Sequence, residues 1–311
     1  MAAIRAWSAD NLSDLSGKCI IVTGGNSGIG FQAAAEFAHK GASVVLACRS
    51  IEKARAAAAK ITEGDARVAV EIMELDLASL ASVRNFARSF RARYRDLHVL
   101  CNNAGIMAIP HRRTADGFEM QFGTNHLGHF ALTALLLEPL LWTNSARVVT
   151  VSSGAHWMGR IQFEDLQWER GYSEWLAYAQ SKLANLLFTF ELQRRAERAG
   201  VRLRSVACHP GYAATNLQTA GPRMQGFWML EAAMDFANRV FAQSAAMGAL
   251  PLLYAAASPD VVSGDYIGPD GLGELRGYPI KVSCSAAARD PTTAQRLWQV
   301  SEELTGIRFD F

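Results

Sequence analysis

The sequence predicts an α/β protein with a doubly wound parallel sheet of about seven strands and helices on both faces of that sheet. Apolar runs of strand length alternate with helix-length segments along nearly the whole chain, which is typical of βαβ units. The first runs are apolar throughout, as expected for strands that are buried on both faces. A glycine-rich turn at residues 23–30 joins the first run to an Ala-rich helix. In such sheets ligands bind beyond the carboxyl ends of the strands, so we expect the functional site there.

Each element has a local signal in the sequence. The expected strands are the apolar runs at residues 20–22, 43–50, 67–76, 97–105, 146–154, 201–211 and 264–267. The expected helices follow the glycine-rich turn, cover residues 51–62, 79–94, 115–141, 174–200 and 243–257, and close the C-terminus. Asp290 can cap this last helix, Pro291 suits its first turn and Gly306 suits its end. Gly123 and Gly128 fall inside a predicted helix and indicate close packing or a local distortion there.

Composition narrows the class of protein. The 311 residues are 50% hydrophobic and 19% charged, so the chain can bury a substantial core, and we expect one domain over residues 1–311. A formal net charge of +2 favours small-molecule partners and no nucleic acid. No stretch reaches the ~20 apolar residues that span a bilayer, and the N-terminus lacks the apolar core of a signal peptide. We therefore predict a cytoplasmic protein without an integral membrane segment.

The five cysteines are odd in number, scattered and without a CxxC pair. Four of them lie in or beside apolar runs: Cys19, Cys48, Cys101 and Cys208. This distribution is typical of small buried hydrophobic residues in a reducing compartment. It predicts neither disulfides nor a metal site.

The glycine-rich turn, TGGNSGIG, is the first candidate site. Its glycines let the backbone come close to a ligand, and the free N–H groups at the start of the following helix favour a phosphate. A dinucleotide fits this arrangement, and the turn residues expected to bind it are Gly24, Asn26, Ser27, Gly28, Ile29 and Gly30. The alternative is a tight turn that only needs glycine backbone angles. The position between a buried strand and a helix favours nucleotide binding.

Arg49 ends the second predicted strand, where it bears on the choice of cofactor. Sites for NAD usually present an acidic residue here to bind the ribose 2′-hydroxyl, whereas a 2′-phosphate requires a cation. The nearest acidic residue is Glu52, so the Arg49 guanidinium can pair with a phosphate, and NADP(H) is favoured over NAD. The alternative is an ordinary solvated arginine. At the end of the third strand, beside Leu77, Asp76 can accept from the adenine amino group or cap the following helix.

Tyr178 is the one tyrosine among seven with a lysine four residues later, Lys182. On a helix these side chains share a face, and an ammonium near a phenol favours the phenolate, so we expect the Tyr178 pKa to lie below its usual ~10. A phenol tuned in this way can transfer a proton at neutral pH. The same spacing also occurs on many solvated helix faces, so by itself it decides nothing.

Five motifs in this order resemble those of the short-chain dehydrogenase/reductase family: TGGNSGIG, NNAG at residues 102–105, Asn125 within FGTNHLGHF, VSS at residues 151–153, and the pair Tyr178 and Lys182. The resemblance covers nearly the whole chain and implies a Rossmann-type fold. ACRS, NHLGHF, SKLAN and HPG resemble the branch that contains the retinol dehydrogenases, the WW-domain oxidoreductase and the light-dependent protochlorophyllide reductases.

The resemblance implies a role for each matching residue. Tyr178 would be the acid in reduction and the base in oxidation, and Ser153 would hydrogen-bond the substrate carbonyl oxygen. Lys182 would lower the Tyr178 pKa and hold the nicotinamide ribose, while Asn125 would position Lys182 and a proton-relay water. The further cofactor contacts implied are Asn103, Ala104 and Gly105 after the fourth strand, and Pro210, Gly211 and Thr215 near the nicotinamide.

Two stretches depart from the simplest family pattern or fall outside its motifs, and one histidine requires a separate interpretation. Residues 154–177 lengthen the interval between Ser153 and Tyr178, and we interpret them as a substrate-side loop whose aromatic residues form a local cluster. Residues 212–242, rich in Met and aromatic side chains, are expected to form an apolar substrate lid; a helix packed on the core and a shallow membrane contact are the alternatives. His209 has no acidic or cysteine partner nearby in the sequence, and we interpret it as structural.

The leading hypothesis is an NADP(H)-dependent oxidoreductase that interconverts a ketone or aldehyde and an alcohol on a hydrophobic substrate by hydride transfer. A reductase of C=C bonds and a non-catalytic NADP-binding sensor or scaffold are the alternatives. A sensor would be expected to lose part of the set Asn125, Ser153, Tyr178 and Lys182, and all four are present. The resemblance leaves open a homodimer or homotetramer, which in the family often pairs the two long helices.

Overall fold

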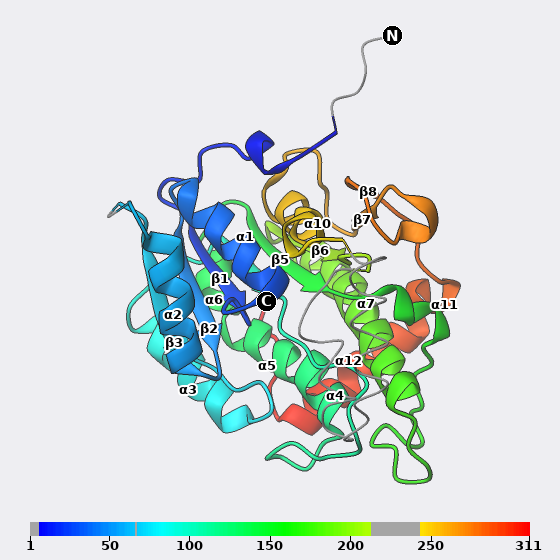
Figure 1. The fold of residues 1–311 in the computed structure, drawn as a ribbon. Helices are drawn as coiled ribbons and strands as arrows, with labels where there is room; N and C mark the ends of the chain where they lie inside the picture. Colours follow the sequence, from blue (N-terminus) through cyan, green and yellow to red (C-terminus); the bar gives the residue numbers. More distant parts are fainter. Residues whose placement is uncertain (1–5, 66, 213–242) are drawn as a thin grey trace.

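One eight-stranded sheet, in the order β3-β2-β1-β4-β5-β6-β7-β8, forms the centre of the part of the chain that the structure describes (Figure 1). The structure is a computed structural model and describes residues 6–65, 67–212 and 243–311. The strands are β1 Cys19–Thr23, β2 Ser43–Cys48, β3 Val70–Glu74, β4 Val99–Asn102, β5 Ala146–Val151, β6 Leu203–Cys208, β7 Tyr266–Pro269 and β8 Pro279–Lys281. Neighbours pair in parallel except β7 and β8. The predicted doubly wound α/β fold is confirmed, with β8 as an antiparallel edge strand that was not predicted.

Helices cover both faces of this sheet (Figure 1). Their bounds are α1 Gly28–His39, α2 Ile51–Thr62, α3 Leu80–Arg91, α4 Met120–Phe122, the π-helix η2 Gly123–Leu127, α5 Gly128–Leu135, α6 Leu137–Leu141, α7 Glu174–Arg198, α10 Ala245–Ala257, α11 Ala286–Arg289 and α12 Pro291–Thr305. Successive residues of β1 point to opposite faces: Ile20 and Val22 pack with α1, α2 and α10, whereas Ile21 packs with α3, α5 and α7. Burial on both faces explains why the strands read as unbroken apolar runs.

The single long helix predicted over residues 115–141 is wrong in its start and its continuity. The helix begins at α4, passes into the π-helix η2 and continues as α5 and α6. The distortion expected at the two glycines is confirmed. A Cβ on Gly123 would lie 2.5 Å from Thr114 Cγ2, and one on Gly128 would lie 2.5 Å from the Leu77 carbonyl oxygen. The close approach of neighbouring chain segments therefore requires glycine at both positions.

Gly128→Ala is expected to lower the free energy of unfolding by about 1–3 kcal/mol, although alanine is the better helix former by about 1 kcal/mol. The added methyl group would meet the backbone of Leu77, which cannot rotate away as a side chain can. Urea unfolding measures the effect. Gly154→Ala is the control, because nothing lies within 4 Å of a Cβ at that position. A Gly128 variant as stable as the wild type would contradict the tight contact.

The C-terminal helix α12 begins and ends as predicted. The Asp290 carboxylate accepts the backbone N–H groups of Thr292 and Thr293, and Pro291 occupies the first turn. Gly306 ends the helix in the left-handed region at φ 61°. These caps satisfy backbone groups that the helix itself leaves unpaired.

Aromatic residues attach α12 to the body of the protein. Trp298 packs edge-on against Phe130 of α5, with ring centroids 5.1 Å apart, and stacks on Phe188 of α7. Phe309, beyond the helix, lies 4.4 Å from Trp298, centroid to centroid. The end of the chain thus covers the outer side of both α5 and α7.

Four further predictions concern the cysteines, the strand near residue 266, membrane-spanning helices and the substrate lid. The cysteines at 19, 48, 101 and 208 are buried, as predicted. The strand expected around residues 264–267 is β7, which is shifted toward the C-terminus, and β8 follows it. Across residues 6–65, 67–212 and 243–311, none of the helices has both the length and the apolar character that crossing a membrane requires. Apart from Tyr212, the predicted lid at 212–242 lies outside the described residues, as does Thr215.

Candidate active site

The glycine-rich turn leaves β1 and enters α1 with an open helix N-terminus. Gly24 and Gly28 adopt left-handed backbone angles, φ 67° and 56°, and a Cβ on Gly30 would lie 2.5 Å from Asn103 Nδ2. The N-cap residue Ser27 makes no side-chain capping hydrogen bond, so the first N–H groups of α1 can receive an anion. The residues present therefore fit the pyrophosphate of a dinucleotide. The predicted turn residues that lie here are Gly24, Asn26, Ser27, Gly28, Ile29 and Gly30.

Thr23, the last residue of β1, connects this turn to the NNAG segment after β4. Its hydroxyl oxygen accepts the backbone N–H groups of Asn103 and Ala104, each at 2.9 Å. The Asn103 Nδ2 donates to the Thr23 carbonyl at 2.7 Å. Gly105 lies close to Asn125, since a Cβ on Gly105 would lie 3.3 Å from Asn125 Oδ1. The NNAG segment therefore lies between the glycine-rich turn and Asn125.

Asn125 is buried in the π-helix η2, where its side chain holds two other segments. Its Oδ1 accepts the Ile106 N–H, and its Nδ2 donates to the Ile106 carbonyl and to the Ser181 hydroxyl, all at 2.9 Å. The Ser181 hydroxyl in turn donates to the Tyr178 carbonyl at 2.7 Å. Asn125 thus ties the loop after β4 to the turn of α7 that carries Tyr178 and Lys182.

His129, one helical turn after Asn125, extends this network to the glycine-rich turn. Burial lowers the pKa of His129 to about 4, so the ring is neutral near pH 7. Its Nδ1–H donates to the Asn125 carbonyl at 3.0 Å, and therefore Nε2, 3.0 Å from Thr23 Oγ1, accepts from the Thr23 hydroxyl. Sequence reasoning missed His129, although its spacing of four residues from Asn125 could have indicated it.

Ser153 follows β5 and is held by the loop that it begins. Its hydroxyl oxygen accepts the Ala155 N–H at 3.2 Å, and its carbonyl accepts Nδ1–H of the buried His156 at 2.7 Å. The other ring nitrogen of His156, Nε2, accepts the Ser285 N–H at 3.2 Å, and burial lowers the pKa of His156. His156 therefore joins the Ser153 loop to the start of α11 as a neutral ring.

Tyr178 and Lys182 lie one turn apart on α7, and both are buried. The Lys182 Nζ lies 5.6 Å from the centre of the Tyr178 ring and donates to the Val151 carbonyl at 3.1 Å. The Ser153 side chain is near enough to Tyr178 to favour its phenolate form. Asn125, Ser153 and the pair Tyr178 and Lys182 are predicted from three separate stretches of sequence, and the structure brings them close together.

Burial controls the acidity of both groups. It raises the pKa of Tyr178 to about 12, and the neighbouring Ser153 side chain opposes this effect. It lowers the pKa of Lys182 to about 8, an effect that Cys208 opposes. The expectation that Lys182 brings the Tyr178 pKa below its usual value is therefore wrong for this structure, because desolvation of the buried phenolate is the largest effect on that pKa.

Arg49 and Asp76 flank the outer part of the site. Arg49 is exposed at the end of β2, and none of the ion pairs among the described residues includes it. Asp76 accepts the Ala78 N–H at 3.0 Å, whereas Ser79 caps α3. The capping alternative for Asp76 is therefore wrong. Leu77 is buried beneath the same turn.

His209, interpreted as structural, is buried and has an acidic partner that lies far away in the sequence. Its Nε2 lies 2.9 Å from Glu274 Oε2, and its Nδ1 accepts the Gly211 N–H at 3.3 Å. Glu274 lies in the loop between β7 and β8, 65 residues away in the sequence, so no local pattern could indicate the contact. The predicted cofactor residues Pro210 and Gly211 follow directly after His209 at the carboxyl end of β6.

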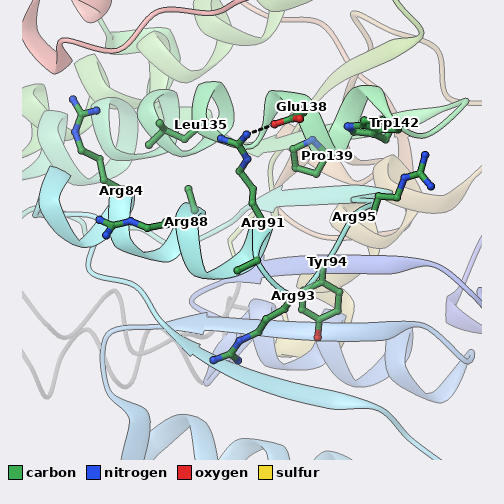
Figure 2. A pocket seen from close by; sticks show the side chains of 12 residues that line it. Arg84, Arg88, Arg91, Arg93, Tyr94, Arg95, Leu135, Glu138, Pro139 and Trp142 are labelled. Carbon is green, nitrogen blue, oxygen red and sulfur yellow. Dashed lines mark hydrogen bonds and ion pairs between the residues drawn. The ribbon is translucent and has the colours of Figure 1, made fainter.

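A separate groove of about 810 Å³ lies between α3 and the α5–α6 pair and contains none of these residues (Figure 2). Five arginines line the groove, and the side chain of each contacts another residue of the protein. Arg91 pairs with Glu138, Arg93 pairs with Glu71, and the Arg95 guanidinium lies 4.3 Å from the centre of the Trp142 ring. The other two hydrogen-bond within the chain: Arg84 to the Thr305 carbonyl and Arg88 to Asn85. These contacts give the arginines a structural role between helices.

Comparison with known proteins agrees with the geometry. The family model described as short chain dehydrogenase matches residues 18–225. This chain belongs to that family. Retinol dehydrogenase 11 from Homo sapiens is 43% identical to this short chain dehydrogenase over 298 residues, covering 95% of this chain and 88% of that protein.

Solved structures of similar chains show the same fold. A crystal structure of a protein from Mycobacterium paratuberculosis superposes with a TM-score of 0.81 and 45% identity, covering 98% of this chain and 100% of that one. A short chain dehydrogenase from Shigella flexneri 2a str. 301, complexed with NADP, gives a TM-score of 0.63 and 25% identity over 82% of this chain and 98% of that one. This short chain dehydrogenase is therefore an oxidoreductase of the retinol dehydrogenase branch, which confirms the predicted family and branch.

Proposed function

We propose that this short chain dehydrogenase interconverts a ketone or aldehyde and an alcohol on an apolar substrate, with NADP(H) as its cofactor. The observation that carries the proposal is the meeting of Ser153, Tyr178 and Lys182 beyond β5, next to Asn125 and the NNAG segment. Bound NADPH would supply the hydride. The protein groups would then bind the carbonyl oxygen and deliver its proton.

Tyr178 and Ser153 would act together on the substrate oxygen. The raised pKa of Tyr178 keeps the phenol protonated at neutral pH, which suits the acid in carbonyl reduction. The neighbouring Ser153 hydroxyl would donate to the same oxygen. The buried Lys182 ammonium would stabilise the negative charge that develops there, in surroundings where water screens little. Asn125 would keep this turn of α7 in register with the loop after β4.

The cofactor would cross the carboxyl ends of β2, β1, β4, β5 and β6. The glycine-rich turn would hold its pyrophosphate, Arg49 its 2′-phosphate, and Asp76 with Leu77 its adenine. Asn103, Ala104 and Gly105 would follow its length, and Pro210 with Gly211 would meet its nicotinamide end. The Shigella relative complexed with NADP supports this choice of cofactor.

Arg49→Ala is expected to raise KM for NADPH about 10- to 100-fold, because a charge-assisted hydrogen bond to phosphate is worth about 1.5–3 kcal/mol. The KM for NADH, which lacks the phosphate, should change little. Steady-state assays with both cofactors measure the split. Arg55→Ala, at another exposed arginine nearby, is the control. An equal loss for NADH and NADPH would exclude the phosphate contact.

We also propose the substrate class. Several relatives that are 42–43% identical to this chain are named retinol dehydrogenases, and this supports a long apolar aldehyde or alcohol of retinoid type. The test is NADPH and NADH oxidation at 340 nm with apolar aldehydes, ketones and one enone. NADPH-dependent turnover of an aldehyde or ketone supports the proposal. Product analysis on the enone identifies C=C reduction, and NADPH binding with no turnover of any compound would favour a sensor.

The organisation of the protein belongs to the same proposal. The continuous sheet supports one domain over the chain, with a substrate lid at 212–242. The five free thiols support a reducing compartment such as the cytoplasm. A homodimer or homotetramer stays a prediction.

A further inference from the structure

The segment His209–Tyr212, after β6, is held from one side by the loop between β7 and β8. The His209 N–H donates to the Ile267 carbonyl at 2.9 Å, and the Tyr212 N–H donates to the Leu275 carbonyl at 2.7 Å. Gln243 adds a third tie, since its Nε2 donates to the Pro210 carbonyl at 2.6 Å. The backbone here is therefore fixed at each end and in the middle.

The His209 ring is the buried centre of this arrangement. Its side chain is 3% exposed, while that of Glu274 is 31% exposed. Because Nδ1 accepts the Gly211 N–H, a neutral ring carries its proton on Nε2 and donates it to the Glu274 carboxylate at 2.9 Å. The carboxylate thus selects one tautomer, and that tautomer receives the amide of Gly211.

The backbone around His209 and Glu274 has close contacts and unusual angles that make room for their side chains. A Cβ on Gly268 would lie 2.1 Å from His209 Nε2, and one on Gly211, at φ 65°, would lie 2.5 Å from the Leu275 carbonyl oxygen. Glu274 itself adopts a left-handed angle, φ 56°, which is unfavourable for a residue with a side chain and persists only where neighbouring contacts hold it. Gly211, Gly268 and Glu274 therefore each have a backbone angle or a close contact that is unfavourable for most residues. All three lie around the hydrogen bond between His209 and Glu274.

Sheet order places this pair at one end of the proposed cofactor site. The glycine-rich turn follows β1, whereas His209 follows β6, with β4 and β5 between them. On the β6 side lie the reacting groups: the N–H of Ser152, next to Ser153, donates to the Cys208 carbonyl at 2.8 Å, and Cys208 influences the pKa of Lys182. The half of a cofactor that reacts would therefore rest against the segment that His209 holds.

We infer that Glu274 is a positioning residue, which acts through His209 to fix the Gly211 backbone and so determines the affinity for the nicotinamide half of the cofactor. The inference rests on the proposed function, because it needs NADP(H) to bind here. The adenine half, at the opposite end of the strand order, is outside the reach of the pair.

The test compares two ligands that differ only in the nicotinamide half. Dissociation constants for NADPH and for 2′-phospho-ADP-ribose are measured without substrate on the wild type, Glu274→Ala and Glu274→Gln. Glu274→Ala should weaken NADPH about tenfold, as expected for loss of one charge-assisted hydrogen bond, and leave 2′-phospho-ADP-ribose unchanged. Glu274→Gln keeps an acceptor oxygen for Nε2–H and should recover most of the NADPH affinity.

Further variants separate positioning from general damage. Glu303→Ala, at an exposed acid of α12, should change neither constant. The double variant His209→Ala/Glu274→Ala should bind NADPH no more weakly than His209→Ala alone, because Glu274 acts through the ring. Equal weakening of both ligands, or unchanged NADPH binding in Glu274→Ala, would overturn the inference while leaving the proposed function intact. A wild type that binds neither ligand would overturn the proposed function and, with it, this inference.

Discussion

Tyr178→Phe is expected to lower kcat for carbonyl reduction about 10²- to 10⁴-fold, the range that a general acid contributes. The ring of Tyr178 is buried, so phenylalanine fills the same space and the loss is confined to the hydroxyl group. The dissociation constant for NADPH should stay close to that of the wild type. Steady-state turnover and fluorescence titration of NADPH measure the two quantities on the same preparations.

The pH dependence provides an independent check on the same residue. Reduction needs the protonated phenol, and with a Tyr178 pKa of about 12 its rate should not fall through loss of the acid across the neutral range. Oxidation of the alcohol needs the phenolate and should therefore rise with pH toward that value. A Tyr178→Phe enzyme with wild-type turnover would remove Tyr178 from the chemistry.

Lys182→Met is expected to lower kcat about 10²- to 10³-fold, the size of effect seen when one preorganised electrostatic donor is removed. Methionine has a similar length and no charge, so the cavity stays filled while the ammonium next to the reacting oxygen is lost. Burial lowers the pKa of Lys182 to about 8, which means that the folded protein disfavours the charged form. The variant should therefore be at least as stable as the wild type near neutral pH.

Thermal unfolding and turnover together test whether the role of Lys182 is electrostatic or structural. Low activity with an unchanged or higher Tm supports the electrostatic role, whereas low activity with a lower Tm would indicate a structural one. Lys281→Met is the matched control, because Lys281 is half exposed in β8 and pairs with Asp265 at the surface. That variant should keep its activity and, as surface ion pairs contribute little, nearly all of its stability.

Most of the fold could be predicted because its signals are local. The buried strands show as apolar runs, and the caps of α12 use residues next to each other in the chain. The antiparallel strand β8 could not be predicted, since it has three residues, two of them exposed, and therefore carries neither an apolar run nor a clear alternation. The π-helix η2 depends on how Gly123 and Gly128 meet Thr114 and Leu77, and such contacts exist only after folding.

In the candidate site, too, the residues that stand in local motifs could be predicted, whereas contacts between distant segments could not. Ser153, Tyr178 and Lys182 could be picked out because each stands in a short motif, and the structure brings them together. The partner of His209 could not, because Glu274 reaches it across the ends of neighbouring strands. The pKa of Tyr178 was predicted in the wrong direction because spacing along a helix shows the nearby charge but not the burial of the ring.

The aromatic contacts of α12 bear on how the protein is made. Phe130 and Phe188 are synthesised well before Trp298, which packs on both of them. Chains emerge from the ribosome N-terminus first, and exposed apolar surface on such intermediates promotes aggregation. The outer faces of α5 and α7 therefore stay uncovered until α12 has been synthesised. Truncated variants that lack α12 are expected to accumulate as insoluble protein, even though every residue proposed to react is still present.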